Sequence, residues 1–286
     1  MIKSKRGEIM NKKDDLGNRM KGYENISRYY LTKKTPVIIR IDGKAFHNFT
    51  RGFKRPFDDI LIKSMQETAK YLCENIMGCK LAYTQSDEIS LLLVDYERNE
   101  SQSWFGNNLQ KLCSVSASMA TMAFNKAFLS NLTEWMAVNK IASIGFLNEG
   151  KDEDLIRLDK AYWKAYSNGA MFDARAFILP KEEVSNYFIW RQQDATRNSI
   201  QMVAQSLFSH KELQNKNCNE LQELMFQEKD VNWNNFNNVY KRGSCIIKKT
   251  YNINECTRNR WTVDKEIPIF TQDREYINKY VFIKEN

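Results

Sequence analysis

The sequence predicts an α+β protein with a two-layer, ferredoxin-like β-α-β-β-α-β core, to which further helices and a C-terminal extension are added. Three observations lead to this fold class: strand-type and helix-type segments follow each other in that order, a tight turn joins the two middle strands, and the composition is globular. Of the 286 residues, 42% are hydrophobic and 27% are charged, which excludes a fully disordered chain. No apolar run approaches the roughly 20 residues that span a bilayer, so a membrane protein is excluded too.

Each core element has its own residue pattern. A β-branched run at 37–41 stops at the turn signal Asp42-Gly43, and helices are indicated where apolar residues recur at a spacing of three or four. The predicted elements are a strand at 37–41, a helix at 57–77, strands at 80–85 and 88–94, a helix at 104–128 and a strand at 172–179. This order predicts an antiparallel sheet whose first and third strands are central and adjacent, with two helices on one face.

The rest of the chain is less regular. Residues 1–35 are polar and charged, with a short amphipathic stretch at 16–30, and residues 130–170 are mixed. Further on, the patterns indicate a helix at 181–209, a helix near 221–226 and a strand near 245–249, whereas no structure is assigned to 251–286. We divide the chain into a core with its N-terminal segment at 1–180 and a helical and mixed region at 181–286 that packs on it.

Charge, cysteine and histidine counts restrict the function. Six Cys without a C-x-x-C pair, in a chain with no apolar leader, indicate reduced thiols and a cytoplasmic protein. Two His exclude a zinc site built on several imidazoles. A net charge of +8 and 12% aromatic residues favour a polyanionic partner such as nucleic acid. The chemistry must then come from carboxylates, Lys and Arg or backbone groups, which points to a hard cation such as magnesium.

Two carboxylates come at the ends of the central strands. Asp42 ends the first strand and Asp87 lies in the turn before the third, so both should meet at one edge of the sheet. Such a pair can hold two divalent ions about 3.5–4 Å apart and thereby promote phosphoryl or nucleotidyl transfer. Gly43 would let the backbone approach phosphate or metal closely, whereas Glu88 should point to the face opposite Asp87. Taken singly, both sequences are ordinary turns, and only their combination favours a metal site.

Five segments resemble the signatures of the tRNA-histidine guanylyltransferase superfamily and occur in the family's order. They are Arg40-Ile-Asp42-Gly43-Lys44-Ala-Phe46-His47-Asn-Phe49, Gln85-Ser86-Asp87-Glu88-Ile89-Ser90, Phe172-Asp173-Ala-Arg175, Trp190-Arg191-Gln192-Gln193-Asp194 and Tyr240-Lys241-Arg242-Gly243. The resemblance implies a polymerase-palm-type catalytic core and a nucleotidyltransferase. It further implies ATP, GTP and other nucleoside triphosphates as substrates, tRNA as partner, and a homo-oligomer, either dimer or tetramer.

The resemblance also implies roles for individual residues. Asp42 and Asp87 would be catalytic and would hold two Mg²⁺ ions per active site together with the backbone of Gly43. The implied nucleotide-binding residues are Arg40, Lys44, Ala45, Phe46, His47, Asp58, Ser86 and Lys111. Candidates for contact with RNA or its 5′ phosphate are Arg19, Lys21, Arg175, Arg191, Asn198, Lys241 and Arg242. Trp190 is interpreted as a core residue.

One departure selects a branch of the superfamily. Thr196-Arg197-Asn198-Ser199 stands where the tRNA-histidine-specific enzymes have H-I-N-N, and this loss resembles the like-protein branch. The branch implies template-dependent repair of 5′-truncated tRNA in the 3′-5′ direction. In that reaction ATP adenylylates the 5′ end, which the 3′-hydroxyl of an incoming nucleotide then attacks. Addition of a single G to tRNA-histidine, a nucleotide cyclase and a non-catalytic tRNA-binding protein stay open as alternatives, as does a mitochondrial location in a eukaryote.

Overall fold

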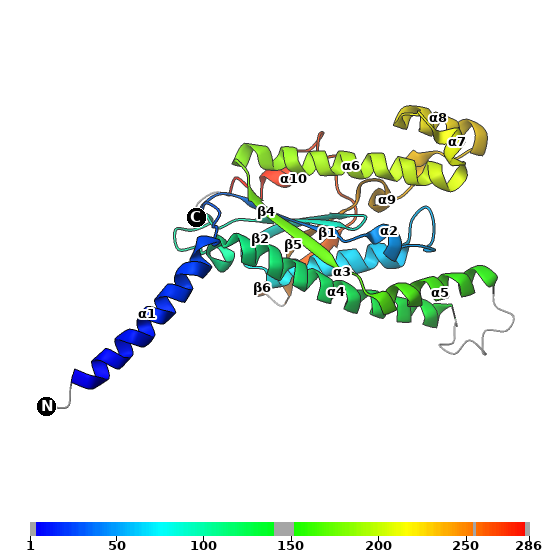
Figure 1. Cartoon of the computed structure of the whole chain (residues 1–286). Coiled ribbons are helices and arrows are strands. Elements are labelled where there is room, and N and C mark those ends of the chain that lie inside the picture. Colours follow the sequence, from blue (N-terminus) through cyan, green and yellow to red (C-terminus); the bar gives the residue numbers. More distant parts are fainter. Residues whose placement is uncertain (1–3, 140–151, 254–255, 284–286) are drawn as a thin grey trace.

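A six-stranded antiparallel sheet with helices on both faces forms the body of the protein (Figure 1). The computed structural model describes residues 4–139, 152–253 and 256–283. The strands are β1 Val37–Gly43, β2 Cys79–Gln85, β3 Glu88–Leu93, β4 Phe172–Ile178, β5 Ser244–Ile253 and β6 Cys256–Asp264. Their order in the sheet is β4-β1-β3-β2-β5-β6, so β1 and β3 are adjacent at the centre of the predicted four strands.

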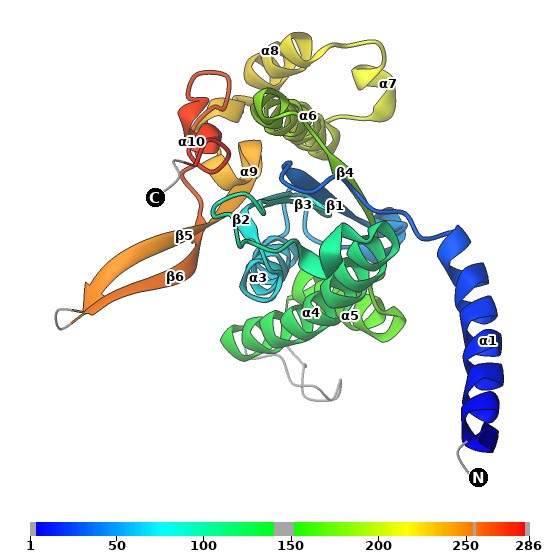
Figure 2. The same cartoon turned by 90° about the vertical axis from the view of Figure 1, so that its left-hand side faces the viewer.

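The helices divide between the two faces of the sheet (Figures 1 and 2). They are α1 Ser4–Ile26, α2 Phe46–Phe49, α3 Asp59–Asn75, α4 Leu109–Val138, α5 Glu153–Asn168, α6 Lys181–Leu207, α7 His210–Leu213, α8 Cys218–Lys229, α9 Asn238–Arg242 and α10 Glu275–Asn278, with short 3-10 turns η1 Trp104–Asn107 and η3 Trp233–Asn235. The helices α3 and α4 cover one face, and α6 with α10 covers the other. Within the described ranges, no helix is long and apolar enough to cross a membrane.

The central strands are apolar on both sides because both sides are covered. Ile39 and Ile41 face the core beneath α3 and α4, whereas Ile38 packs with Phe188 of α6 on the other face. A strand buried on both faces lacks the alternation of a half-exposed strand, and only Arg40 interrupts the apolar residues at 37–41. The predicted α+β fold class, the antiparallel sheet and the neighbouring positions of β1 and β3 are confirmed.

Outside this core the structure adds elements that the sequence analysis did not assign. The mixed region 130–170 contains the end of α4, which runs ten residues past 128, and all of α5. The helices predicted at 181–209 and near 221–226 are confirmed as α6 and α8, and the strand near 245–249 is the first part of β5. Residues 251–286 supply β6 and α10. The division of the chain at residue 180 stays a prediction.

Two segments project from the body (Figure 2). The helix α1 leaves it on one side, and the side chains described on this helix, at residues 15–26, are exposed or half-buried. On the other side, β5 pairs with β2 only through Ser244–Ile247, and beyond that point it pairs with β6 alone as a two-stranded ribbon. In this ribbon Lys249 lies directly opposite Arg260, so two positive charges face each other.

Candidate active site

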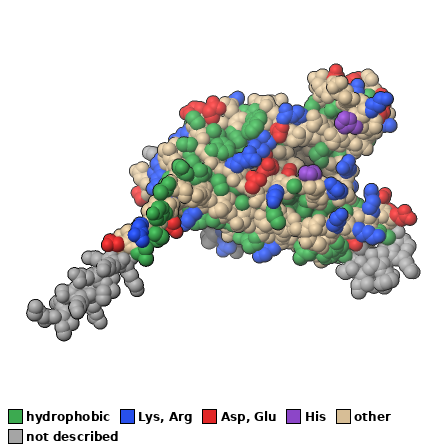
Figure 3. All heavy atoms as spheres, viewed as in Figure 1, with side chains coloured by type: hydrophobic (Ala, Val, Ile, Leu, Met, Phe, Trp, Pro, Cys, Tyr) green, Lys and Arg blue, Asp and Glu red, His purple; other side chains and the backbone are tan. Residues whose placement is uncertain are grey.

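A cavity of about 590 Å³ opens where β1 and the β2–β3 turn end beside α2 (Figure 3). Its walls come from segments far apart in the chain: the end of β1 with α2, the loop before α3, the β2–β3 turn and α6. The lining residues are Asp42, Gly43, Ala45, Phe46, His47, Thr50, Phe53, Lys54, Arg55, Pro56, Asp58, Leu61, Ser86, Asp87, Met202 and Gln205. The sheet topology thus brings the two carboxylates singled out in the sequence to one cavity.

Asp42 and Asp87 are linked through the backbone as well as through the cavity. The amide of Gly43 donates a hydrogen bond to the carbonyl oxygen of Asp87 over 3.1 Å, which holds the β2–β3 turn against the end of β1. Burial raises the pKa of Asp87, the hydroxyl of Ser86 at 3.0 Å opposes this rise, and the negative charge of Asp42 adds to it. Two carboxylates that repel each other in a partly desolvated cavity are stabilised by a bound cation.

The backbone of the cavity wall is unusual at two residues and tightly packed at a third. Ala45 has φ 53° and Ser86 has φ 49°, a left-handed conformation that costs energy for residues with a side chain and is typical of functional sites. A Cβ atom on Gly43 would lie 2.2 Å from the ring of Phe46. Phe46 in turn packs on Phe124 of α4, with ring centroids 5.5 Å apart. Position 43 therefore requires glycine so that the Phe46 ring can pack against the core and anchor the loop. This packing requirement is separate from the predicted close approach of the backbone to phosphate or metal.

Asp58 organises the opposite wall. Its carboxylate accepts hydrogen bonds from the amide of Leu61 at 3.0 Å, the amide of Lys54 at 3.1 Å and the hydroxyl of Tyr162 at 2.7 Å. It is the N-cap of α3, and burial raises its pKa despite these donors. Because its oxygens are already engaged, Asp58 acts in this structure as a residue that positions the loop carrying Lys54 and Arg55.

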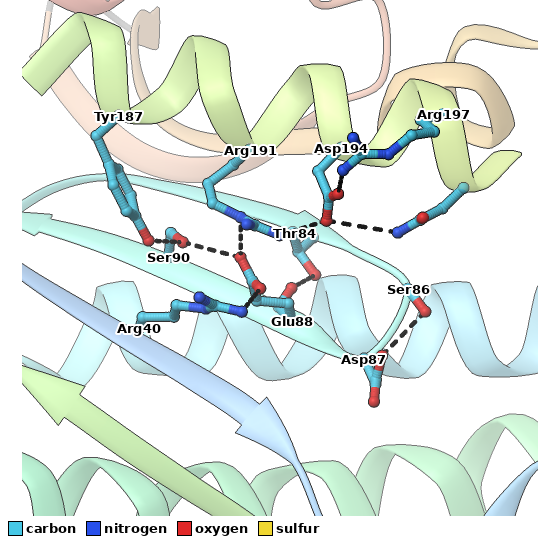
Figure 4. Close-up of polar contacts among 11 residues, drawn as sticks. Arg40, Thr84, Ser86, Asp87, Glu88, Ser90, Tyr187, Arg191, Asp194 and Arg197 are labelled. Carbon is cyan, nitrogen blue, oxygen red and sulfur yellow. Dashed lines mark hydrogen bonds and ion pairs between the residues drawn. The ribbon is translucent and has the colours of Figure 1, made fainter. Parts of the chain in front are cut away.

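Next to the cavity, a chain of charged side chains fastens α6 to the sheet (Figure 4). Glu88 is buried and points toward α6, whereas Asp87 points away from that helix, as the predicted alternation requires. The Glu88 carboxylate contacts the guanidinium of Arg40 at 2.7 Å and that of Arg191 at 2.8 Å. Burial raises the pKa of Glu88, and the charges of Arg191 and Arg40 oppose that rise. Arg191 also contacts Asp194 at 2.7 Å, and Arg197 pairs with Asp194 from the exposed side.

The structure brings together only part of the predicted site. The residues that line the cavity are Asp42, Gly43, Ala45, Phe46, His47, Asp58, Ser86 and Asp87. Arg40 does not line it, since it is paired with Glu88 on the side of α6. Lys44 is exposed outside the lining, and its amide donates to the carbonyl of Met171 at 2.9 Å. Lys111 lies in the first turn of α4, more than three turns before Phe124, which places it about 20 Å along the helix from the residue that contacts the α2 loop.

The predicted RNA contacts are dispersed over the molecule. Arg19 and Lys21 are on the projecting α1, and Arg175 is exposed on β4 opposite Arg40. Asn198 lines a smaller pocket that adjoins the cavity. Two of the remaining side chains make structural contacts: Arg191 belongs to the Glu88 cluster, and the ammonium of Lys241 donates to the carbonyl of Asn234 at 2.6 Å. For Arg242 it is the backbone carbonyl that accepts a hydrogen bond, from the hydroxyl of Tyr83 at 2.8 Å.

The interpretation of Trp190 as a core residue is wrong. Its side chain is 51% exposed, with the guanidinium of Arg191 4.3 Å from the ring. The buried face of α6 follows Val184, Phe188 and Ala195, and Trp190 stands about 200° around the helix from Phe188. The hydrophobic side chain of Trp190 suggested a core position, but its angular position around α6 places it on an exposed face.

Sequence reasoning missed several residues that line the cavity. They are Thr50, Phe53, Lys54, Arg55, Pro56, Leu61, Met202 and Gln205. Lys54 and Arg55 could have been found, because both come shortly before Asp58 in the sequence. Met202 and Gln205 carried no such signal. They reach the cavity only because α6 crosses above the end of β1, and that crossing depends on packing between residues more than 100 positions apart.

Comparisons with known proteins agree with this geometry. A family model described as tRNAHis guanylyltransferase (Thg1) matches residues 17–180, more than half of the chain. A bacterial tRNA(His) guanylyltransferase (Thg1)-like protein solved in complex with ATP is 45% identical, has a TM-score of 0.76, and the match covers 94% of this chain and 100% of that one. A structure of such a bacterial protein with GTP gives 44% identity, a TM-score of 0.72 and coverage of 94% and 99%. The tRNA(His) guanylyltransferase of Debaryomyces hansenii is 28% identical over 233 residues, 77% of this chain and 76% of that one.

These matches define the class of the protein as a nucleotidyltransferase, which its palm-type sheet and paired carboxylates also indicate. The chain belongs to the tRNAHis guanylyltransferase family. Its identity to the bacterial like protein is 45%, against 28% to the Debaryomyces hansenii enzyme named for tRNA(His).

Proposed function

We propose that this protein adds nucleotides to the 5′ end of tRNA in the 3′-5′ direction and repairs 5′-truncated tRNA by copying the opposite strand. The observation that carries the proposal is the placement of Asp42 and Asp87 in one cavity together with the cations of Lys54 and Arg55. The bacterial like proteins at 45% and 44% identity, solved with ATP and with GTP, support nucleotides as the ligands of such a cavity.

The donor atoms at the cavity suit magnesium. Asp42, Asp87 and the backbone of Gly43 offer only oxygen, the ligand type of hard cations. Among the described residues no group of three or more His, Cys, Asp or Glu side chains is arranged to hold a metal ion, so water and substrate phosphates would complete the coordination, as is usual for Mg²⁺. When bound, magnesium would neutralise phosphate charge and align the attacking and leaving oxygens.

The chain itself contributes charge and position to the reaction. In the activation step, an oxygen of the tRNA 5′-monophosphate attacks the α-phosphorus of ATP and pyrophosphate leaves. In the addition step, the 3′-hydroxyl of the incoming nucleotide attacks the 5′ phosphorus and AMP leaves. Lys54 and Arg55 face the negative charge that develops on the phosphates, and Asp58 keeps their loop in place. Base pairing with the opposite strand selects the nucleotide.

End-labelling of transcripts tests this proposal. We expect the protein to extend 5′-truncated tRNAs of several identities with the nucleotide complementary to the opposite strand. Exclusive addition of one G to tRNA-histidine would favour the tRNA(His)-specific alternative. A cyclic product from ATP or GTP alone would favour a cyclase, and tRNA binding without any incorporation would favour a non-catalytic protein. A cytoplasmic location stays a prediction.

We also propose a homo-oligomer in which α1 packs on a second copy of the chain. Leu16, Met20 and Tyr23 occupy one face of this helix at positions i, i+4 and i+7, and they are 52%, 46% and 65% exposed. Most helical stability in proteins comes from packing of an apolar face, and the side chains at residues 15–26 of α1 are little covered by their own chain. A partner that covers this apolar face would stabilise it.

Light scattering on a charged variant measures the contribution of α1. We expect Leu16→Glu with Tyr23→Glu to shift the mass toward the 33.7 kDa monomer, because two carboxylates would have to be desolvated in the interface. The matched control is Asn18→Glu, a charge added on the opposite face of the same helix. An unchanged oligomer mass in the double variant would contradict the proposal.

A further inference from the structure

A second cavity continues from the active site toward α7 and α8. It has a volume of about 390 Å³ and lies where the end of α6 meets the α7–α8 segment; Figure 3 shows the surface hollowed beneath that lobe. Arg55 and Gln205 line both this groove and the catalytic cavity. The second cavity, called the groove below, therefore shares a wall with the catalytic cavity, and a bound polymer such as RNA could extend from one into the other.

The groove has the charge and hydrogen-bonding groups of a polyanion site. Arg55 and Lys216 supply cations, and His210 adds an imidazole. Gln201, Gln205 and Gln214 add side-chain amides, which can both donate to and accept from phosphates, sugars and base edges. Among the described residues that line the groove, none is acidic.

Two acidic residues at the starts of the helices beside the groove are held by other groups. Glu212 of α7 accepts hydrogen bonds from the amide of Ser209 at 2.8 Å and from its hydroxyl at 2.5 Å. Glu220 of α8 accepts from the amide of Asn217 at 2.6 Å. Both contacts are capping boxes, so each carboxylate is turned back onto its own helix start and its charge is partly balanced by the helix dipole. The groove therefore keeps its positive character.

The proposed function indicates which polyanion would bind in the groove. At the end of a tRNA the opposite strand of the acceptor stem runs on past the 5′ nucleotide as a single-stranded 3′ extension. With the 5′ end at Asp42 and Asp87, this extension must leave the catalytic cavity on some side. Unpaired nucleotides suit a groove with cations and amides, whereas a duplex is recognised over a broader surface that spans its grooves and backbone.

We propose that the groove lined by Arg55, His210 and Lys216 binds the single-stranded 3′ extension of the tRNA whose 5′ end is being extended. This inference rests on the proposed function and adds a second anchoring point for the substrate. Binding of the extension would fix the template strand relative to the two carboxylates. The groove would then distinguish a tRNA end with its extension from a blunt RNA duplex.

Binding of matched RNAs tests the groove. The two RNAs are a 5′-truncated tRNA with its 3′ extension and the same tRNA with the extension removed. We expect the wild-type protein to bind the extended form about tenfold more tightly, and Lys216→Ala to lose most of that difference while binding the blunt form unchanged. Loss of one phosphate contact should also lower the salt dependence of binding to the extended form, by about 0.7 in the slope of log K against log salt.

Lys211→Ala is the matched control, because Lys211 is an exposed lysine of α7 that does not line the groove. Arg55 is left unchanged, since it also lines the catalytic cavity. Equal binding of the two RNAs by the wild-type protein would overturn the inference, and so would equal effects of Lys216→Ala and Lys211→Ala. These outcomes leave the proposed function intact if truncated tRNA is still extended. Absence of any nucleotide addition, with the binding difference present, would instead remove the proposed function alone.

Discussion

Replacing Asp87 with asparagine should reduce nucleotide addition by about 10³-fold or more while leaving the fold intact. The substitution keeps the shape of the side chain but removes one of the two charges that would hold a cation at the end of β1. Such charge stabilisation is worth several kcal/mol in a transition state, which corresponds to a loss of this size. Single-turnover addition to a truncated tRNA at saturating magnesium measures it, and undiminished addition would contradict the role of Asp87.

The same variant should be more stable than the wild type in the absence of metal and nucleotide. Burial and the charge of Asp42 raise the pKa of Asp87 above its unfolded value, so the ionised carboxylate destabilises the folded state at neutral pH. The wild-type protein should accordingly gain stability at this residue as pH falls through the raised pKa, and Asp87→Asn should lack that gain.

Thermal unfolding of two variants separates this effect from general damage. Asp154→Asn removes an exposed carboxylate from the first turn of α5, far from the cavity, and should change neither activity nor Tm appreciably. A fall in Tm together with the loss of activity in Asp87→Asn would indicate a structural role for Asp87 instead.

Removal of Arg191 should destabilise the protein by about 3–5 kcal/mol. Glu88 and Arg191 are both buried, and Arg191→Met would leave the Glu88 carboxylate with Arg40 as its remaining ion-pair partner and the hydroxyl of Ser90 at 3.5 Å. Without the Arg191 charge, the pKa of Glu88 should rise further above its ordinary value. Part of the lost stability should therefore return as pH falls and Glu88 becomes protonated.

Urea unfolding of a second variant provides the comparison. Arg197→Met removes the exposed partner of Asp194 on the same helix and should cost only about 0–1 kcal/mol, as is usual for surface ion pairs. If Arg191→Met and Arg197→Met lowered the free energy of unfolding equally, the prediction that burial makes the Arg191 contact the more stabilising one would be wrong.

The core of the fold could be predicted because its signals are local. The run at 37–41 and the Ser86-Asp87 turn define strands by themselves, and their order then gives the sheet. The strand near 245–249 was predicted and is the first part of β5, but its pairing with β2 and the strand β6 were not predicted. The helix α5 was missed although its apolar spacing is helical, since the residues before it are polar and irregular.

The site was predictable to a similar extent and for the same reason. Residues next to the two carboxylates, such as Gly43, Ala45 and Ser86, line the cavity because the chain itself delivers them there. The motif predicts that Arg40 binds nucleotide, and in the structure its guanidinium is paired with Glu88 of the adjacent strand β3. A motif shows which residue types occur together in the sequence. The contact partner of each side chain depends on packing and charge across the whole fold and cannot be predicted from the motif alone.

The like-charged pair on the β5–β6 ribbon should respond to ionic strength in the opposite sense to the ion pairs elsewhere on the surface. Lys249 and Arg260 repel each other in a stretch where no third strand supports the ribbon. Salt screens this repulsion, so the outer ribbon should become more ordered as ionic strength rises. An exposed ion pair such as Lys63–Glu134 weakens under the same conditions. Amide hydrogens of the outer ribbon should therefore exchange more slowly in high salt, and a polyanion lying along it would act in the same direction as the salt.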